Sequence, residues 1–421
     1  MNPENLSRPF VVIGGGIAGL CVARELALRG ARVTVVERGR IGQPDGRGAA
    51  TPASVGVLTA PRSGSSPLRR LQLLSHRAYP HFVRRICEET GLDVGYSVPG
   101  SLHLHKEPPR DRTRVKLEKA YVDAGVRCGW VEGGELRDLA PYLADRFRTA
   151  LRIPDEGIVD PTALLVALAA SSRGLGVEIL EEAGETRLHC AAAPRLDLEK
   201  GGNMTGAVFI VAAGAWSAHV VGRTESYDDF FPAGSSLPDE AEESQPPWRA
   251  GVSGAPCPGG GLVLRPIRGQ ALELSAGWER GPNLRFRPPG RDRDYHAIAK
   301  GGGRVWIGST VEAAGFDARV TDGGRAELLD AAREIFPGVL GEEVIRAWAG
   351  LRPQALRRGG PFLGPLPGAV DVWVHCGHYR SGILMGPLTA RLLVHEIAGD
   401  EEAIRREGFD LDALRALRVD R

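Results

Sequence analysis

The first 38 residues alternate between apolar runs and a helical pattern. An apolar run beginning at Phe10 leads into a cluster of glycines, and the next apolar run ends at Glu37. Between these runs apolar residues recur on one helical face, and we expect Arg24 and Glu25 on the opposite, outward face of an amphipathic helix. The pattern predicts a strand, a tight turn, a helix and a second strand, in that order.

Further patterns extend over the rest of the chain. Helical periodicity predicts helices over residues 68–90, 112–124, 161–173, 325–336 and 382–396. Apolar runs predict strands over 208–213 and 370–376, and alternation predicts antiparallel strands over 262–274 and 304–312. Residues 40–66 are rich in glycine and serine, so we expect them to form a long binding loop. The stretch 222–261, rich in proline, glycine, serine and acidic residues, is a predicted long excursion.

Length and composition narrow the class of protein. A chain of 421 residues, 43% hydrophobic and 25% charged, is typical of a globular protein with two domains. The net charge of +1 offers no field for nucleic acid or an anionic membrane, so a small-molecule partner is favoured. The six cysteines form no CxxC pair, which argues against a disulfide framework and a metal site. Without a secretion signal or an apolar membrane segment, we expect a cytoplasmic protein.

The glycine cluster contains a nucleotide-binding motif. Gly14, Gly16 and Gly19 form G-x-G-x-x-G between the first predicted strand and helix, and Glu37 ends the next strand. The glycines permit a tight turn and a close approach to a pyrophosphate, and a carboxylate at the second strand's end binds the adenosine ribose. The motif predicts a dinucleotide site without separating NAD from FAD. Its place at the start of the chain and the glycine-rich loop 46–58 favour FAD.

Five blocks carry a resemblance to a known family. They cover residues 11–38, 53–61, 208–217, 348–364 and 376–393, and the last two contain GLRP and GHYRSGI. With these blocks the chain resembles the D-amino-acid oxidase superfamily of flavoproteins, and within it the glycine oxidases of the thiamine-biosynthesis type. The resemblance implies an α/β fold in which a Rossmann-like, glutathione-reductase-like FAD domain is interleaved with an α+β substrate domain on an antiparallel sheet.

The same resemblance implies where the two domains divide. The FAD domain would take residues 8–66, 151–221 and 340–415, and the substrate domain 67–150 and 262–339. The excursion at 222–261 is longer than expected for the family. Two roles stay open for it, a lid and an interface element.

Individual residues receive roles from the resemblance. Arg352 of GLRP matches the arginine that binds the substrate carboxylate, and Arg380 lies in the loop that meets the flavin ring. Both are also expected to contact FAD, together with Gly14, Gly16, Ile17, Ala18, Gly19, Glu37, Arg38, Ala53, Ser54, Gly56, Val57, Ala213, Gly214, Trp216, Tyr379, Ser381, Gly382 and Ile383. Physical chemistry supports the roles, since an arginine fork binds a carboxylate and a helix beginning at Gly382 stabilises negative charge on a reduced flavin.

The sequence departs from the family pattern in the predicted substrate pocket. Simple register places His296 where a glycine oxidase has a carboxylate-binding tyrosine, with Tyr295 one residue earlier on the opposite face of the strand. Both are candidate substrate residues. Ala299 and Lys300 replace the customary proline and arginine of that strand. The cysteine motif of covalent flavin attachment does not follow Arg352, so we expect non-covalent FAD.

The implied reaction is oxidation of a small amino acid such as glycine, sarcosine or a small D-amino acid. A hydride would pass from its α-carbon to flavin N5, giving an imine, then an oxo acid and, with oxygen, hydrogen peroxide. Two alternatives stay open: a D-amino-acid dehydrogenase with a quinone acceptor, and a non-catalytic flavoprotein subunit. The expected partners are therefore an amino acid and oxygen or another acceptor, and the sequence is compatible with a homo-oligomer.

Overall fold

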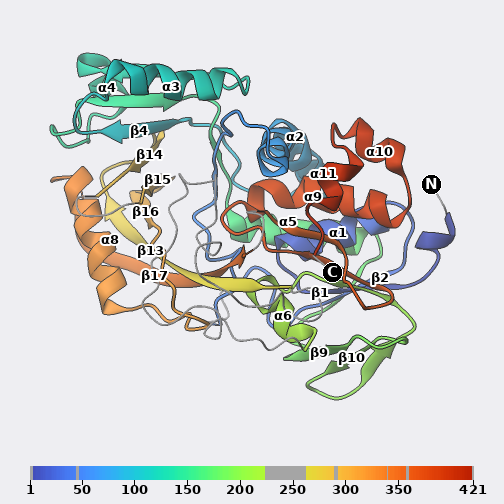
Figure 1. The fold of residues 1–421 in the computed structure, drawn as a ribbon. Coiled ribbons are helices and arrows are strands. Elements are labelled where there is room, and N and C mark those ends of the chain that lie inside the picture. The colour runs from blue at the N-terminus through green and yellow to red at the C-terminus, as the bar shows by residue number, and fades with distance from the viewer. Residues whose placement is uncertain are drawn as a thin grey trace, which may run out of the picture.

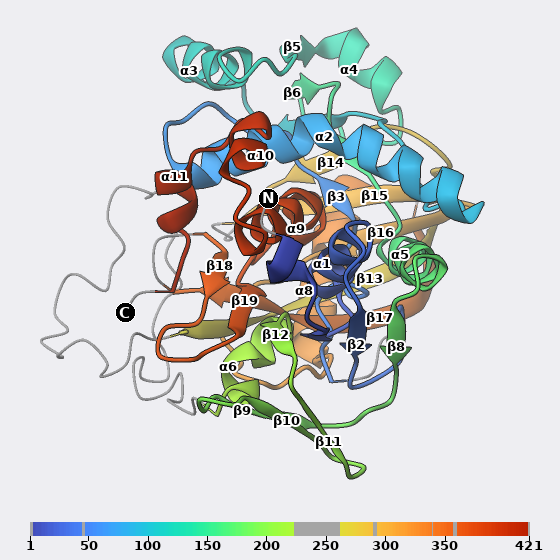
Figure 2. The same cartoon turned by 90° about the vertical axis from the view of Figure 1, so that its right-hand side faces the viewer.

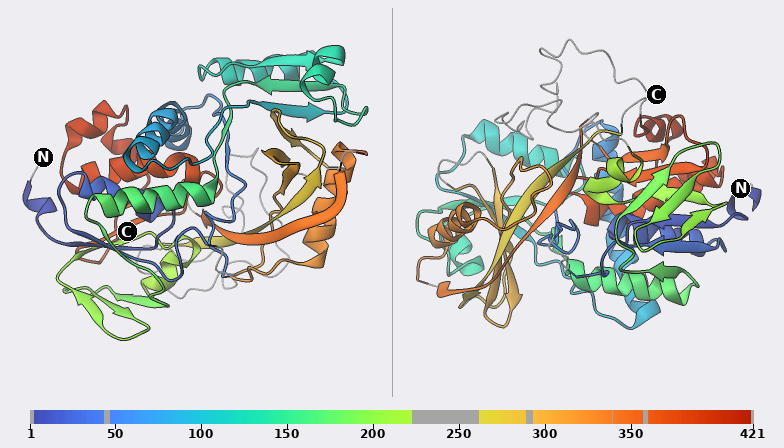
Figure 3. Two further views of the ribbon diagram at one scale, coloured as in Figure 1. Left: turned by 180° about the vertical axis from the view of Figure 1, so that it is seen from behind. Right: turned by 90° about the horizontal axis from the view of Figure 1, so that it is seen from below.

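The computed structural model describes residues 3–43, 47–222, 262–288, 293–338, 340–356 and 360–419. Within these ranges a six-stranded and an eight-stranded sheet form two lobes that stand side by side (Figures 1 and 3). The excursion predicted at 222–261 lies outside the described residues, except for Gly222.

The six-stranded sheet contains the predicted strand–turn–helix–strand unit. Its central strands are buried on both faces, which explains why they read as continuous apolar runs. All neighbouring pairs are parallel except the edge pair β18 and β19. The order is β18 (Phe362–Pro365), β19 (Val372–Cys376), β12 (Val208–Val211), β1 (Phe10–Ile13), β2 (Val33–Val36) and β8 (Glu178–Leu180).

Helices cover one face of this sheet and a small antiparallel sheet covers the other. A core cluster joins the strands to α1 (Ile17–Ala27), α5 (Pro161–Gly174), α9 (Gly382–Ile397) and α2 (Pro67–Thr90). Figure 2 shows α2 lying across α9 and α1. A second cluster joins the other face to the three-stranded sheet of β9 (Thr186–His189), β10 (Arg195–Leu198) and β11 (Asn203–Thr205).

The eight-stranded sheet forms the other lobe, and all its neighbours pair antiparallel except β14 and β4. Its helix α8 (Asp322–Ile335) packs against the sheet, and α3 (Asp111–Val122) and α4 (Gly133–Leu139) lie at the β5 edge (Figure 2). The order is β17 (Leu340–Ala355), β13 (Leu264–Ala276), β16 (Arg304–Gly308), β15 (Tyr295–Gly301), β14 (Asn283–Phe286), β4 (Ser101–His105), β6 (Thr149–Ile153) and β5 (Gly129–Glu132).

Short elements complete the described chain. They are η1 (Pro3–Leu6), the pair β3 (Val57–Leu58) and β7 (Gly157–Ile158), η2 (Gly214–Trp216), α6 (Ser217–Val220), α10 (Glu401–Arg406) and α11 (Leu411–Arg415). Within the described ranges, no helix combines the length and the apolar composition needed to cross a membrane.

The five helices predicted after the first are confirmed to within three residues at each end. The largest difference is the start of α8, predicted at Arg325 and found at Asp322. The hydroxyl of Thr321 accepts a hydrogen bond from the N–H of Gly324 at 3.1 Å, so this side chain caps the helix earlier than its apolar pattern begins.

Two expected domain boundaries differ from the packing. Strand β17 belongs to the eight-stranded sheet, although residues from 340 onward were assigned to the FAD domain. Helix α2 contacts α9 and α5 in the first lobe, although residues from 67 onward were assigned to the substrate domain. The chain therefore crosses between lobes after α2 and again after β17, because the buried faces of these elements meet different cores.

Candidate active site

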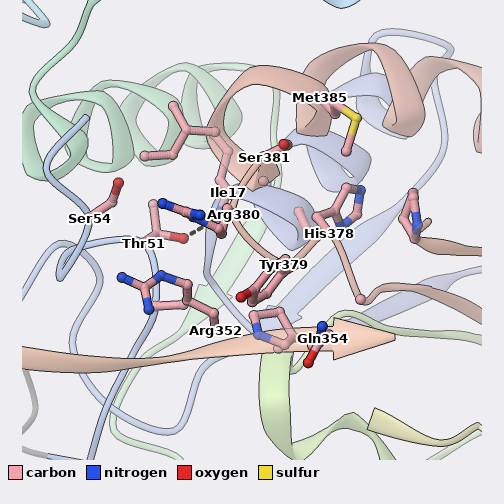
Figure 4. A pocket seen from close by; sticks show the side chains of 18 of the residues that line it. Ile17, Thr51, Ser54, Arg352, Gln354, His378, Tyr379, Arg380, Ser381 and Met385 are labelled. Carbon is pink, nitrogen blue, oxygen red and sulfur yellow. Dashed lines mark hydrogen bonds between the residues drawn. The ribbon is translucent and has the colours of Figure 1, made fainter. Parts of the chain in front are cut away.

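One cavity of about 1890 Å³ is lined by residues of both lobes. Its wall includes the β1–α1 turn, the loop after β2, the cavity-facing residues of β14 and β15, the end of β17 and the β19–α9 loop. Figure 4 shows the side chains of Thr51, Arg352, Tyr379 and Arg380 reaching one space from three of these segments. The cavity brings together segments more than 300 residues apart in the sequence.

The turn between β1 and α1 depends on glycine. Gly14 has a φ of 111°, and a Cβ there would lie 2.6 Å from a backbone oxygen just beyond β12. A Cβ at Gly19 would overlap the Gly14 carbonyl oxygen, so α1 packs directly onto the turn. Gly16 starts α1 without a side-chain cap of its own, and the N–H of Ile17 donates to the hydroxyl of Thr51 at 3.3 Å. The N-terminus of α1 thus lies at the cavity, where it suits a phosphate group.

Glu37 and Arg38 line the cavity at the end of β2. The carboxylate of Glu37 accepts hydrogen bonds from the N–H groups of Gly15 at 2.6 Å and Gly39 at 2.9 Å, which hold it beside the glycine turn. The guanidinium of Arg38 stacks 4.3 Å from the ring centre of Trp216. The cavity next to the glycine turn therefore contains the carboxylate of Glu37, which accepts hydrogen bonds, and the stacked side chains of Arg38 and Trp216.

The loop from β19 to α9 has an unusual backbone. Gly377 has a φ of 81° and Tyr379 a φ of 52°, a left-handed conformation that costs a non-glycine residue about 1–2 kcal/mol. The N–H of Tyr379 donates to the carbonyl of Pro353 at 2.8 Å, which ties the loop to β17. Ser381 then provides the N-cap position of α9 without a side-chain hydrogen bond. The backbone N–H groups at the start of α9 border the cavity.

Three buried side chains behind this loop, His375, His378 and Thr389, form a hydrogen-bonded cluster. His375 Nδ1 lies 3.1 Å from the carbonyl oxygen of Ala18, and its Nε2 lies 2.8 Å from the Thr389 hydroxyl. Burial lowers the pKa of His375 to about 4 and the pKa of His378 well below its ordinary value, so both rings are neutral. Since a carbonyl only accepts, the neutral His375 carries its proton on Nδ1. The Thr389 hydroxyl donates to the carbonyl of Met385 at 2.9 Å, and the same oxygen lies 3.0 Å from His378 Nε2.

Arg352 lies in the cavity wall with its guanidinium held in place. One terminal nitrogen donates to the carbonyls of Thr310 at 3.1 Å and Arg268 at 3.4 Å, and the other donates to the hydroxyl of Ser309. Gly269 lies under the guanidinium, where any Cβ would collide with it. These contacts leave the planar fork in one orientation.

The structure separates Tyr295 from His296. Tyr295 is 2% exposed, and its hydroxyl donates to Glu327 inside the eight-stranded lobe, so it does not line the cavity. His296 lines the cavity because successive residues of β15 face opposite sides. Burial, together with the charges of Arg285 and Arg380, lowers the pKa of His296 to about 3. The cavity therefore presents a neutral imidazole at this position.

The residues present fit a flavin nucleotide. The crowded position of Gly14 and the close packing of the loop at Ala53 against Gly350 leave room only for backbone, as a bound dinucleotide requires. The side-chain oxygen of Gln354 is buried at the cavity and has no hydrogen-bond partner among the described residues. A ring bearing N–H groups would satisfy that oxygen.

Comparison with known families decides the class. The model of the FAD dependent oxidoreductase family matches residues 10–234 and 247–396. The chain belongs to this family. Its cofactor is accordingly FAD, and the protein is an FAD-dependent oxidoreductase enzyme with a Rossmann-like FAD-binding domain.

Named relatives of this oxidoreductase are similar over nearly their whole length. The glycine oxidase of Geobacillus kaustophilus is 28% identical over 403 residues, which cover 95% of each chain. That of Pseudomonas aeruginosa is 28% identical over 414 residues, covering 95% of this chain and 97% of the relative. The crystal structure of the G. kaustophilus glycine oxidase superimposes with a TM-score of 0.76 and 27% identity, covering 99% of both chains.

Most residues predicted for the oxidoreductase's site line the cavity, and three do not. Tyr295 lies in the core of the eight-stranded lobe, as described above. Gly19 packs against the Gly14 carbonyl, which is the strand–helix contact expected of the third motif glycine. Gly56, with a φ of 77°, packs against the backbone of Val159. The cavity-lining positions are Gly14, Gly16, Ile17, Ala18, Glu37, Arg38, Ala53, Ser54, Val57, Ala213, Gly214, Trp216, His296, Arg352, Tyr379, Arg380, Ser381, Gly382 and Ile383.

Sequence reasoning missed four residues of this site. Thr51 caps α1, Ser309 holds Arg352, Gln354 presents the buried oxygen, and Arg285 lies beside His296. Thr51 lies just before the block 53–61, Gln354 lies inside the block 348–364, and Ser309 lies in the predicted strand 304–312. Their role depends on hydrogen bonds between distant segments, so residue type alone gave no signal.

Proposed function

We propose that the protein oxidises the Cα–N bond of a small amino acid, such as glycine, sarcosine or a small D-amino acid. The product is an imine, which water hydrolyses to the oxo acid, and oxygen receives the electrons as hydrogen peroxide. The observation that carries the proposal is the held guanidinium of Arg352 in the wall of the flavin cavity. The names of the relatives, glycine oxidases, support the same class of substrate.

Arg352 binds the substrate carboxylate in this proposal. A guanidinium fork makes two parallel hydrogen bonds to a carboxylate, which fixes the direction of the α-carbon. FAD, when bound, supplies the ring that accepts the hydride. His296 is neutral, so it offers a hydrogen bond to the substrate without competing for its carboxylate. The N-terminal end of α9 and Arg380 border the same cavity and stabilise negative charge there.

The purified holoenzyme tests the proposal directly. Glycine, sarcosine and D-alanine are added separately without oxygen, and the flavin absorbance band is followed. Bleaching by one of them, followed by hydrogen peroxide formation on admitting air, is the expected result. A flavin that stays oxidised with every amino acid would overturn the proposal. Bleaching with dye reduction but no peroxide would instead identify a dehydrogenase with another acceptor.

A further inference from the structure

Three side chains form a row across the eight-stranded sheet and line the cavity. His296 on β15 is paired with Arg285 on β14, and Arg285 is paired with His103 on β4. Partners directly opposite on neighbouring strands point to the same face, so these groups lie next to one another. This row belongs to the substrate lobe, away from the glycine turn that suits a nucleotide.

Arg285 is the charged member of the row. Burial lowers the pKa of His103 and lowers the pKa of His296 to about 3, so both imidazoles are neutral. Arg285 donates from Nε to Asp294 at 2.8 Å, and Arg287 donates to the other oxygen of the same carboxylate at 2.9 Å. Burial would raise the pKa of Asp294, but the two arginines outweigh it and hold that pKa at about 2. Two guanidiniums therefore share the Asp294 carboxylate at the cavity wall. A second carboxylate, that of the buried Glu156, lies 3.6 Å from His103 Nε2 but does not line the cavity.

The whole cavity wall carries more arginines than carboxylates. Among the described residues that line it are ten arginines but only three carboxylates, those of Glu37, Glu185 and Asp294. Glu37 and Glu185 follow β2 and precede β9, on the nucleotide lobe. The pyrophosphate of bound FAD offsets part of the positive charge at that end. On the substrate lobe, Asp294 is the one carboxylate among the described residues of the cavity wall, and Arg285, Arg287 and Arg293 line the same wall.

The row also relates Arg285 to Arg352. The guanidinium of Arg352 is bound to Ser309, which follows Gly308, and Gly308 is paired with His296. Arg285 is the next partner in the row, so its backbone lies about two strand spacings, roughly 10 Å, from that of Gly308. The guanidiniums of Arg352 and Arg285 thus both border the cavity. The neutral imidazole of His296 lies on β15, between β14, which carries Arg285, and β16, which leads to the Ser309 that holds Arg352.

We propose that the preferred substrate is an amino dicarboxylate, with its α-carboxylate on Arg352 and its second carboxylate on Arg285. This inference rests on the proposed function and deepens it. A single-carboxylate substrate such as glycine brings no anion to Arg285 beyond the Asp294 carboxylate that it shares with Arg287, whereas a short dicarboxylate meets both Arg352 and Arg285. His296 lies on β15, between the strand of Arg285 and the strand that leads to Ser309, and so between the two proposed carboxylate sites.

Substrate competition tests the proposal. The kcat/KM values of the holoenzyme for iminodiacetate, D-aspartate and D-glutamate are compared with those for glycine, sarcosine and D-alanine. At least one dicarboxylate should exceed every monocarboxylate by tenfold or more. In Arg285→Gln the dicarboxylate-to-monocarboxylate ratio should fall by about 30-fold or more, since a buried charge pair is lost. Arg285→Lys, which keeps the charge, should fall less.

A matched control separates this site from general loss of charge. Arg304 lies on β16, two strands away from Arg285, and forms an ion pair with Glu273. Its side chain is half exposed and does not line the cavity, so Arg304→Gln should leave the dicarboxylate-to-monocarboxylate ratio unchanged. A binding measurement avoids turnover: malonate and succinate, which carry no amine, should perturb the flavin spectrum at lower concentration than acetate does. This difference should disappear in Arg285→Gln.

The failures of the two proposals are distinguishable. If no amine bleaches the flavin, the proposed function is wrong. If glycine or sarcosine bleaches it and no dicarboxylate has a higher kcat/KM, only the dicarboxylate inference is wrong. An Arg285→Gln variant with an unchanged ratio and unchanged succinate binding would also overturn the inference.

Discussion

Arg352 and Ser309 are hydrogen-bonded across the cavity edge of the eight-stranded sheet, the guanidinium of one donating to the hydroxyl of the other. The backbone carbonyl of the next residue, Thr310, accepts from the same guanidinium. These hydrogen bonds occupy part of the edge of the guanidinium and fix its orientation. The pair joins β17 to the end of β16, so the direction of the fork depends on both strands.

Replacing Arg352 should chiefly weaken substrate binding. Arg352→Ala should raise KM for a carboxylated substrate by about 30-fold or more, because truncating one partner of a desolvated charge pair costs about 2–5 kcal/mol. Arg352→Lys keeps the charge without the fork and should lie between. Ser309→Ala should raise KM by tenfold or less, since one hydrogen bond is worth about 1 kcal/mol. Peroxide-coupled kinetics measure all three, and an unchanged KM in Arg352→Ala would refute the carboxylate role.

The third glycine of the nucleotide motif should not tolerate a methyl group. Gly19→Ala places a Cβ onto the Gly14 carbonyl, so the variant should purify with less FAD and a lower melting temperature. Gly174→Ala is the matched control, because Gly174 ends α5 with open space around it. Alanine favours a helix by about 1 kcal/mol over glycine, so the control should be equally or more stable. Full flavin content in Gly19→Ala would contradict the packing argument.

Thr389 should stabilise the loop before α9 through its hydroxyl. Thr389→Val keeps the shape but leaves His375 Nε2 and His378 Nε2 without a partner, and each buried unpaired group costs about 1–3 kcal/mol. We expect a lower urea midpoint and weaker FAD retention. Thr389→Ser retains the hydroxyl and should behave much more like the wild type. A Thr389→Val variant as stable as the wild type, or a larger loss in Thr389→Ser than in Thr389→Val, would contradict the role of the hydroxyl.

Stability should fall with acid because of the buried neutral histidines. The pKa of His375 is about 4 in the folded protein, below the ordinary value near 6.5, so between these pH values the unfolded chain binds a proton that the folded protein does not. The contribution is complete above pH 6.5 and declines as the pH drops, by about 1.5 kcal/mol between pH 6.5 and 5. His296 and His378 act in the same direction.

Urea unfolding of the holoenzyme at several pH values measures this effect. His375→Gln should make the fall in stability between pH 6.5 and 5 shallower than in the wild type. The exposed His81 provides the control, and His81→Gln should keep the wild-type slope. A slope that is the same in all three proteins would contradict the account.

The local parts of the fold could be predicted from the sequence, because their causes are neighbours in the chain. The turn at Gly14 and the helix after it follow from consecutive residues. The alternation of Tyr295 and His296 was also predictable, but which of them faces the cavity depends on how β15 pairs with β14 and β16.

The missed features depend on contacts between distant segments. Nothing local to Thr389 indicates that two histidines of another segment meet its hydroxyl. Strand β17 was assigned to the wrong lobe for the same kind of reason, since only its long pairing with β13 shows where it belongs. Residue type alone does not distinguish Arg285 from the many other arginines of the chain. Its place in the cavity wall follows from the register of β14 with its neighbouring strands.

The strand order of the first sheet has a consequence for how the protein is made. Strand β12 lies between β1 and β19, and β19 is synthesised some 160 residues after β12. During synthesis, one edge of β12 therefore stays without its final neighbour while strands β13 to β17 of the eight-stranded sheet are translated. An open apolar strand edge invites pairing with other chains. The nascent protein is thus most prone to aggregation late in translation, and FAD can meet its complete site only once residues after Val372 have emerged.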